Sequence, residues 1–85
     1  MVNLMTERDG PVFDPRGAKL VYVQIADDIA DRITRGIYAE RIPSLGEITD
    51  EYGCARMTAR RAVRELRDRG LVEIVPGKGT FVITR

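Results

Sequence analysis

Residues 55–69 of the chain read ARMTARRAVRELRDR, and the rest of the sequence is best interpreted from this stretch. Four apolar residues follow the i, i+3, i+4, i+7 spacing of one helical face: Ala59, Ala62, Val63 and Leu66. Six arginines occupy other positions, opposed only by Glu65 and Asp68. Because Arg56, Arg60 and Arg64 are spaced four apart, they share one edge of the helix. The pattern predicts an amphipathic helix with a packed face and an arginine-rich edge.

An edge of guanidinium groups suits phosphate oxygens and guanine edges, since each planar group can form two parallel hydrogen bonds. The alternative is a basic face that contacts only solvent. Residues 1–54 carry six Lys/Arg and ten Asp/Glu, whereas residues 55–85 carry eight and three. The two parts therefore have net charges of −4 and +5, although the whole chain is only +1. This segregation predicts a basic binding surface formed by residues 55–85.

The composition excludes several classes of protein. Eighty-five residues allow one domain with a small core. With no histidine and one cysteine, neither an ordinary zinc site nor a histidine-based catalytic group is expected, so we predict no metal, no cofactor and no enzyme activity. The single thiol, Cys54, is expected to be buried and structural. One cysteine and no long apolar run at the N-terminus predict a cytoplasmic protein without a membrane segment.

The chain before the arginine helix divides into an arm and a helix. Residues 1–19 predict a flexible arm, because glycine and proline interrupt any regular element there. Residues 20–85 are expected to form the folded domain. From Tyr22 to about Arg35, isoleucines recur at helical spacing and predict a first amphipathic helix. Three aspartates are expected on its solvated side: Asp27, Asp28 and Asp31.

A second, shorter helix is predicted from Leu45 to Tyr52, after a connector with a short edge strand at residues 41–42. Ser44 and Glu47 form the Ser-x-x-Glu pattern of a capping box, which satisfies N–H groups at a helix start. Gly53 ends this helix, and a tight turn leads into the arginine helix. Two short helices joined by a glycine-containing turn form a helix-turn-helix pattern.

Residues 71–75 and 80–84 are predicted to be the strands of a hairpin, joined by a turn of sequence PGKG. Such a turn is ordinary by itself, but after a helix-turn-helix it indicates a wing. Its tip offers Lys78 and backbone N–H groups to phosphate or to the minor groove. Gly77 and Gly79 do not form a nucleotide-binding loop, since no helix follows them. The predicted fold class is mainly α with a small β-hairpin: a winged helix-turn-helix of three helices plus a wing.

At this point the chain resembles the winged helix-turn-helix DNA-binding domain of the GntR family of bacterial repressors. The resemblance covers about residues 20–83. It is carried by YVQIA at 22–26, IPS at 42–44, ARMTARRA at 55–62, GLV at 70–72 and GKGTFV at 77–82. It implies a sequence-specific DNA-binding transcription regulator, and a repressor in particular. Helix 55–69 would enter the major groove, and the wing, residues 75–80, would contact the minor groove or the backbone.

The expected partner is a double-stranded DNA operator. It is expected to be an inverted repeat bound by a homodimer, since a two-fold site doubles the contacts of a small module. The residues expected to bind DNA are Ser44, Arg56, Met57, Thr58, Arg60, Arg61, Arg64, Gly77 and Lys78. Among these, the resemblance implicates Arg56, Thr58 and Arg60 in contacts to bases and phosphates. It assigns Gly77 and Lys78 to the wing and Ser44 to the DNA backbone.

The chain departs from the family pattern in three ways. The family commonly has Glu-Arg after Pro-Ser, with the Arg on DNA, where this chain has Leu45 and Gly46. Met57 replaces a small or hydroxyl residue, so it either contacts a thymine methyl group or packs. Most family members continue into an effector-binding domain, whereas this sequence stops at Arg85. It is either an excised domain or a naturally short regulator, of which we favour the short form, and no effector pocket is expected in it. The alternative function is a winged-helix protein-interaction module that does not bind DNA specifically, and the steep salt dependence of DNA binding distinguishes the two.

Overall fold

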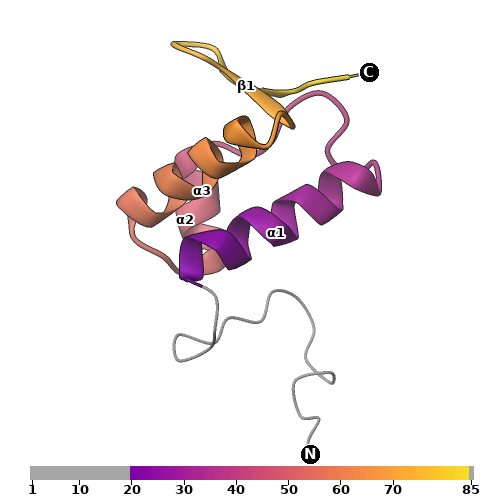
Figure 1. The fold of residues 1–85 in the computed structure, drawn as a ribbon. Coiled ribbons are helices and arrows are strands. Elements are labelled where there is room, and N and C mark those ends of the chain that lie inside the picture. The colour runs from indigo at the N-terminus through magenta and orange to yellow at the C-terminus, as the bar shows by residue number, and fades with distance from the viewer. Residues whose placement is uncertain (1–19, 85) are drawn as a thin grey trace, which may run out of the picture.

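The computed structural model describes residues 20–84. The elements follow in the order α1 (Val21–Thr34), α2 (Leu45–Tyr52), α3 (Arg56–Asp68), β1 (Val72–Val75) and β2 (Gly79–Val82), as Figure 1 shows. Three helices and one hairpin confirm the predicted fold class, and the bounds of α2 are those predicted. The other elements begin and end within two residues of their predicted limits. The arm predicted for residues 1–19 lies outside the described residues.

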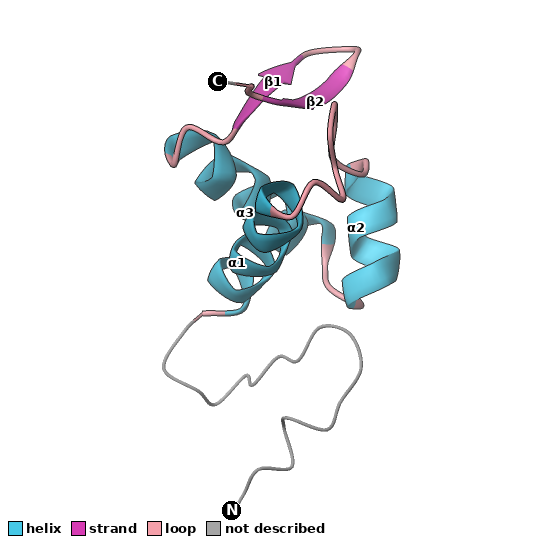
Figure 2. Ribbon diagram, turned by 90° about the vertical axis from the view of Figure 1, so that its right-hand side faces the viewer, coloured by secondary structure: helices cyan, strands magenta, loops and turns pink. Residues whose placement is uncertain are grey.

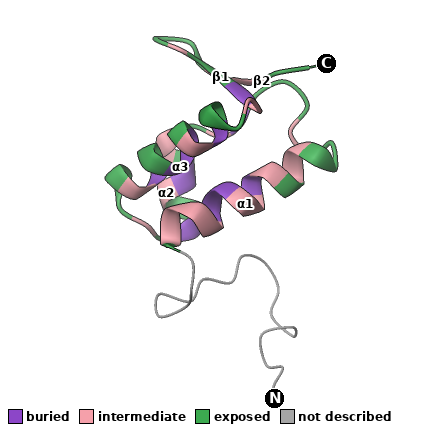
Figure 3. Ribbon diagram, viewed as in Figure 1, coloured by how far each residue is buried: buried purple, intermediate pink, exposed green. Residues whose placement is uncertain are grey.

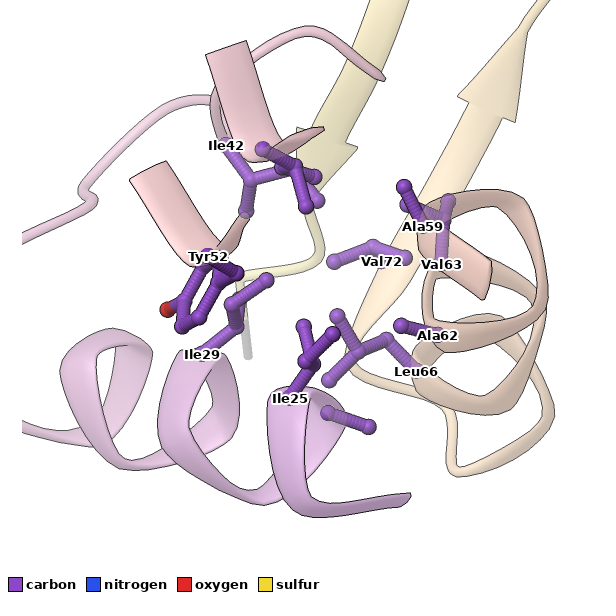
Figure 4. Packing of buried hydrophobic residues seen from close by; sticks show 11 residues of the cluster. Ile25, Ile29, Ile42, Tyr52, Ala59, Ala62, Val63, Leu66 and Val72 are labelled. Carbon is purple, nitrogen blue, oxygen red and sulfur yellow. The ribbon is translucent and has the colours of Figure 1, made fainter. Parts of the chain in front are cut away.

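The core lies where the three helices meet the base of the hairpin. Figure 3 marks buried residues on both α1 and α3, and Figure 4 shows Ile25 of α1 facing Leu66 of α3, with Ile29 beside Tyr52 of α2. The core residues are Ile25, Ala26, Ile29, Ile42, Ile48, Tyr52, Ala59, Ala62, Val63, Leu66 and Val72. The four residues of the predicted apolar stripe on α3 are all among them. Leu66 is fully buried, so its replacement by alanine would cost about 2–5 kcal/mol.

The turn after α3 directs the chain into the hairpin. Gly70 has φ +80°, a left-handed conformation that glycine adopts without strain. Its N–H donates to the carbonyl of Arg67 at 2.9 Å, and the N–H of Leu71 donates to that of Leu66 at 3.1 Å. These two bonds form the Schellman motif that commonly ends a helix. Val72, at the start of β1, is thereby returned to the core beside Leu66.

The hairpin is anchored by the connector that precedes α2. β1 and β2 pair antiparallel, with Val72 opposite Val82 and Val75 opposite Gly79. The predicted edge strand at residues 41–42 is reduced to a single bridge between Arg41 and Phe81. Backbone bonds on each side reinforce it: Ile42 N–H to the Thr80 carbonyl at 3.1 Å, and Val82 N–H to the Glu40 carbonyl at 2.8 Å. Figure 2 shows the hairpin above the helices, with the connector running up to β2. The wing is therefore fixed to the segment that leads into α2.

The acidic side of α1 differs from the prediction. Asp31 is exposed and, among the described residues, pairs only with Arg35 of its own helix, as a solvated residue would. Asp27 instead binds Arg69 at 2.8 Å, and Asp28 accepts a hydrogen bond of 2.6 Å from the hydroxyl of Tyr52. The prediction was wrong for these two residues, because α2 and the end of α3 cover that side of α1. Their carboxylates join the helices to one another.

Arg32 of α1 adds further polar contacts between α1 and α2. Its guanidinium binds Glu51 at 2.6 Å and Asp28 at 3.2 Å, and it donates to the hydroxyl of Tyr38 at 2.9 Å. It also lies over the rings of Tyr38 and Tyr52, 6.0 and 5.7 Å from their centroids. Partial burial opposes the charge, but the hydrogen bonds to Glu51 and Tyr38 outweigh it and raise the pKa of Arg32. Arg32 is thus a structural cation.

Candidate nucleic-acid interface

The side of α3 that faces away from the core carries most of the predicted site residues. Arg56, Arg60, Arg61 and Arg64 are exposed, because the small core residues of the opposite face bring α3 close to α1 and leave this side uncovered. Met57 is 65% exposed, so it does not pack in the core, which was one of its two predicted roles. Thr58 is half-buried beside them. These six predicted residues follow one another along the first nine positions of α3.

The arginines of α3 divide according to their partners. Within residues 20–84, no ion pair or hydrogen bond holds the guanidinium groups of Arg56, Arg60 and Arg64. Arg67, by contrast, contacts Asp68 at 3.2 Å, and Arg69 binds two carboxylates. The unpaired set is the edge that the four-residue spacing predicted. Its hydrogen-bond donors remain available to a ligand with anionic oxygens.

Arg61 has different surroundings from its neighbours. Its guanidinium carbon lies 4.2 Å from the centroid of the Tyr22 ring, within the range of a cation–π contact. Tyr22 belongs to the first turn of α1, so this contact ties the outer side of α3 to α1. Arg61 nevertheless stays exposed, and no carboxylate neutralises it among the described residues. It is positioned by an aromatic ring and keeps its charge available.

The starts of α2 and α3 are satisfied in different ways. At α2 the capping box is present: the Glu47 N–H donates to Ser44 Oγ at 3.2 Å, and the Ser44 N–H donates to the Glu47 carboxylate at 2.9 Å. The hydrogen bonds from the backbone and side chain of Ser44 lower the pKa of Glu47. At α3 the capping position is Ala55, which makes no side-chain hydrogen bond. The first N–H groups of α3 therefore receive no cap from the side chain at this position and suit an anion.

A groove separates the wing from α2 and the first residue of α3. Its volume is about 750 Å³. It is lined by residues of the connector, the start of α2, Arg56 and the whole hairpin turn: Arg41, Ile42, Ser44, Leu45, Gly46, Glu47, Arg56, Ile74, Val75, Pro76, Gly77, Lys78, Gly79 and Thr80. Four predicted site residues meet here: Ser44, Arg56, Gly77 and Lys78. The groove and the outer side of α3 join at Arg56 and form one continuous basic surface.

The tip of the wing is open toward this surface. Gly77 has φ +76°, and nothing lies within 4 Å of the position that a Cβ would occupy there. The turn is closed by a 3.0 Å hydrogen bond from the Lys78 N–H to the Val75 carbonyl, and the Lys78 side chain is exposed. Arg41 donates to the Lys78 carbonyl at 3.3 Å. Arg41 was not among the predicted site residues, although its place beside the buried Ile42 in an edge strand indicates a side chain on the open face.

Two other classes of site are not found in the described part of the chain. Among residues 20–84, no three His, Cys, Asp or Glu side chains are grouped so as to hold a metal ion. No helix in that range has the length and apolar character needed to cross a membrane. Cys54, predicted to be buried, is only partly so: it packs against the core, and this partial burial raises the pKa of its thiol.

The family model of the gntR family of bacterial regulatory proteins matches residues 21–82, which is nearly all of the described chain. The chain belongs to the GntR family. Among its curated relatives, the histidine utilization repressor of Klebsiella aerogenes is 41% identical over 71 residues, which cover 80% of this chain and 30% of the repressor. The mannosyl-D-glycerate transport/metabolism system repressor MngR of Escherichia coli is 37% identical over 68 residues, covering 78% of this chain and 28% of MngR. The chain thus spans less than a third of these GntR relatives.

Solved structures of GntR proteins share the fold. The AraR DNA-binding domain in complex with operator ORR3 superposes with a TM-score of 0.74 and 31% identity, over 89% of this chain and 93% of that one. YtrA from Sulfolobus acidocaldarius, a GntR-family transcription factor, gives a TM-score of 0.76 and 26% identity, over 88% and 81% of the two chains. The resemblance predicted from the motifs at residues 20–83 is confirmed. The GntR winged helix-turn-helix accounts for α1–α3 and the hairpin together.

Proposed function

We propose that this GntR-family chain is a sequence-specific DNA-binding transcription regulator that acts as a repressor. The observation that carries the proposal is the edge of unpaired arginines on α3, which continues into the basic groove beside the wing. Unpaired guanidinium groups suit phosphates and guanine edges, whereas paired ones have already used their donors. The similar AraR domain is bound to an operator, and the similar curated relatives are named repressors.

The nine predicted residues take distinct roles on DNA. Arg56 and Arg60, near the start of α3, read bases in the major groove and bind adjoining phosphates. The hydroxyl of Thr58 donates a hydrogen bond to the same DNA strand, and the exposed Met57 contacts a thymine methyl group. Arg61 and Arg64, further along α3, bind phosphates and set the register of the helix on the duplex.

The groove supports the DNA backbone from the other side. The oxygen of Ser44 already accepts from Glu47, but its hydroxyl proton remains free to donate to a phosphate. Gly77 lets the backbone of the wing approach the minor groove, because no side chain stands in the way. Lys78 adds a cation at the tip of the wing.

The operator is proposed to be an inverted repeat read by a homodimer in the cytoplasm. Two copies related by a two-fold axis place their α3 helices in major grooves about 34 Å apart, one helical turn of DNA. Residues 20–85 are assigned to DNA binding, and no catalytic role is assigned to any residue. The basic surface described above is compatible with this arrangement because it extends from α3 to the wing.

The test is a fluorescence-anisotropy titration of the protein onto DNA taken from upstream of its own coding sequence, with a random duplex as control. We expect tight binding to the upstream DNA. If six to ten phosphates are contacted, affinity falls by about 10³–10⁵ between 50 and 200 mM salt. Equal, weak binding to both duplexes would contradict specific recognition of that operator. Binding that does not respond to salt would contradict the phosphate contacts.

A second candidate function rests on one observation. Met57, at 65% exposure, is an apolar side chain in the middle of the basic surface, and Ile74 of the wing is 38% exposed. Exposed apolar side chains can mark a surface that binds another protein. A protein-interaction module would bind its partner with weak salt dependence and would show no preference between the two duplexes. The same titration therefore distinguishes this candidate from the regulator.

A further inference from the structure

Arg41 lies between the wing and α2, in the connector that pairs with β2. Its backbone bridges to Phe81, and its guanidinium donates from Nη1 to the Lys78 carbonyl at 3.3 Å. A Cβ placed on Gly79 would lie 3.4 Å from Nη1 and 3.9 Å from Cδ of Arg41. The side chain therefore runs along the hairpin turn in space that Gly79 leaves open. Its position is set by the wing.

The charges around the groove show what Arg41 contributes. Among the lining residues, the cations are Arg41, Arg56 and Lys78, and the one carboxylate is Glu47. That carboxylate accepts the backbone N–H of Ser44 within the capping box. The residues of α2 that line the groove include no cation, and Gly46 offers no side chain at all. Arg41 thus supplies the positive charge between Lys78 at the tip of the wing and Arg56 on α3.

Hydrogen-bond capacity also remains on Arg41. A guanidinium carries five N–H donors, and the contact with the Lys78 carbonyl uses one of them. No carboxylate lies within ion-pair distance of Arg41 among residues 20–84, and the side chain is exposed. A group anchored at one nitrogen and open at the others can bind a phosphate with little further loss of side-chain entropy.

We propose that Arg41 is a further DNA-binding residue: anchored on the wing-tip carbonyl of Lys78, its guanidinium binds a backbone phosphate in the groove between the wing and α2. The inference rests on the proposed function, since it requires the basic surface to bind DNA. It assigns Arg41 two tasks that belong together. The residue holds the tip of the wing, and it fixes that tip to the same phosphate strand that α3 approaches through Arg56.

The experiment measures binding of the protein to a random-sequence duplex over a range of salt concentrations, because non-specific binding reports phosphate contacts directly. The variants are Arg41→Gln, which keeps a donor for the Lys78 carbonyl but loses the charge, and Arg41→Lys, which keeps the charge. The control is Arg35→Gln, an equal loss of charge at an exposed arginine outside the groove, whose one ion pair within residues 20–84 is with Asp31. Thermal melting checks that every variant is folded.

We expect Arg41→Gln to reduce the slope of log K against log salt by about 0.9, the value for one lost phosphate contact, with unchanged melting. Arg41→Lys should retain the slope, and Arg35→Gln should behave as the wild type. A loss of affinity in Arg41→Gln without a change of slope would mean that Arg41 only positions the wing, and would overturn the phosphate contact. Wild-type binding in Arg41→Gln would overturn it as well. If the unaltered protein itself shows no salt-sensitive binding, the proposed function fails before any variant is compared.

Discussion

Arg56 and Arg69 lie at opposite ends of α3 and have opposite surroundings. Arg69, at the C-terminal cap, binds Asp27 of α1 at 2.8 Å and Glu65 at 2.9 Å, and only 29% of its side chain is exposed. Arg56, the first residue of the helix, is exposed, lines the groove and has no ion pair among the described residues. One end of α3 is thus fastened to the protein, while the other offers its charge to a ligand.

The difference follows from the packing of α1 rather than from α3 itself. α1 brings Asp27 to the end of α3 and Asp28 to α2, and in the described part of the chain no ion pair joins α1 to Arg56. The hydrogen bond to Glu65 and the one to Asp27 raise the pKa of Arg69, although partial burial opposes this. An arginine held by two carboxylates must break those contacts before it can bind phosphate. An unpaired arginine does not, so the same residue type serves two purposes along a single helix.

The largest expected effect is on DNA affinity, and it comes from replacing the unpaired arginines in the first part of α3. Arg56→Ala and Arg60→Ala should each weaken specific DNA binding by about 1–3 kcal/mol, or about 5- to 150-fold, because each removes a guanidinium that can bind a base in a bidentate way. Melting should not change, since neither side chain contacts the protein through an ion pair in the described part. Anisotropy titration and thermal melting measure the two properties in the same samples.

Arg69→Ala is the matched control on the same helix. It should lower the melting temperature and leave DNA affinity unchanged, the reverse of the Arg56 result. Normal operator binding by Arg56→Ala or Arg60→Ala would mean that the reading surface is placed wrongly. Loss of binding in folded Arg69→Ala would remove the distinction between the two ends of α3.

Arg32, like Arg69, holds helices together, and its replacement is expected to have an intermediate effect on stability. Arg32→Ala removes contacts with Glu51, Asp28 and the Tyr38 hydroxyl at a side chain that is 20% exposed. We expect a loss of about 1–2 kcal/mol in the free energy of unfolding, because hydrogen bonds to partly buried charges exceed surface ion pairs. For a domain of this size, that lowers the melting temperature by roughly 4–16 °C.

Arg35→Ala, which breaks a single exposed pair with Asp31, serves as the reference for Arg32 and should cost only about 0.3–0.5 kcal/mol. DNA affinity should be unchanged in both variants. If Arg32→Ala proved no more harmful than Arg35→Ala, the cluster around Arg32 would be worth no more than an ordinary surface pair. Arg32 would then not count among the cations that hold the helices together.

The features that depend on local pattern were predictable from the sequence. Ala59, Ala62, Val63 and Leu66 recur at helical spacing, so they lie on one face of α3 and that face has to pack against the core. All four residues are buried. The Ser44–Glu47 capping box needs only a spacing of three residues, and both of its hydrogen bonds are present. Positions such as these are determined within a turn or two of the chain, so the helices and the hairpin followed from the sequence.

Contacts between distant elements were not predictable in the same way. The pairing of Asp27 with Arg69 depends on which side of α1 receives α3, and periodicity locates a polar face without identifying what covers it. Arg41 could not be predicted as a site residue, because it belongs to no sequence motif and is brought to the groove by the bridge to Phe81. The predicted site residues do lie on α3, at the start of α2 and on the wing, whereas the cation between them emerged only from the fold.

Arg61 lies between the paired and unpaired arginines, and its replacement is expected to have smaller effects than that of Arg56 or Arg32. Stacked 4.2 Å from the ring of Tyr22, it is positioned by the protein yet remains uncompensated by a carboxylate in the described region. Tyr22→Leu should cost about 0.5–1 kcal/mol of stability, the value of an exposed cation–π contact, and should leave the salt dependence of DNA binding unchanged because the charge stays. Arg61→Ala should cost as much stability and should also reduce the salt slope by about 0.9, since a phosphate contact is lost. If both variants lose stability equally and neither changes the slope, Arg61 belongs with Arg32 and Arg69, and the DNA-binding edge of α3 is limited to arginines without a partner.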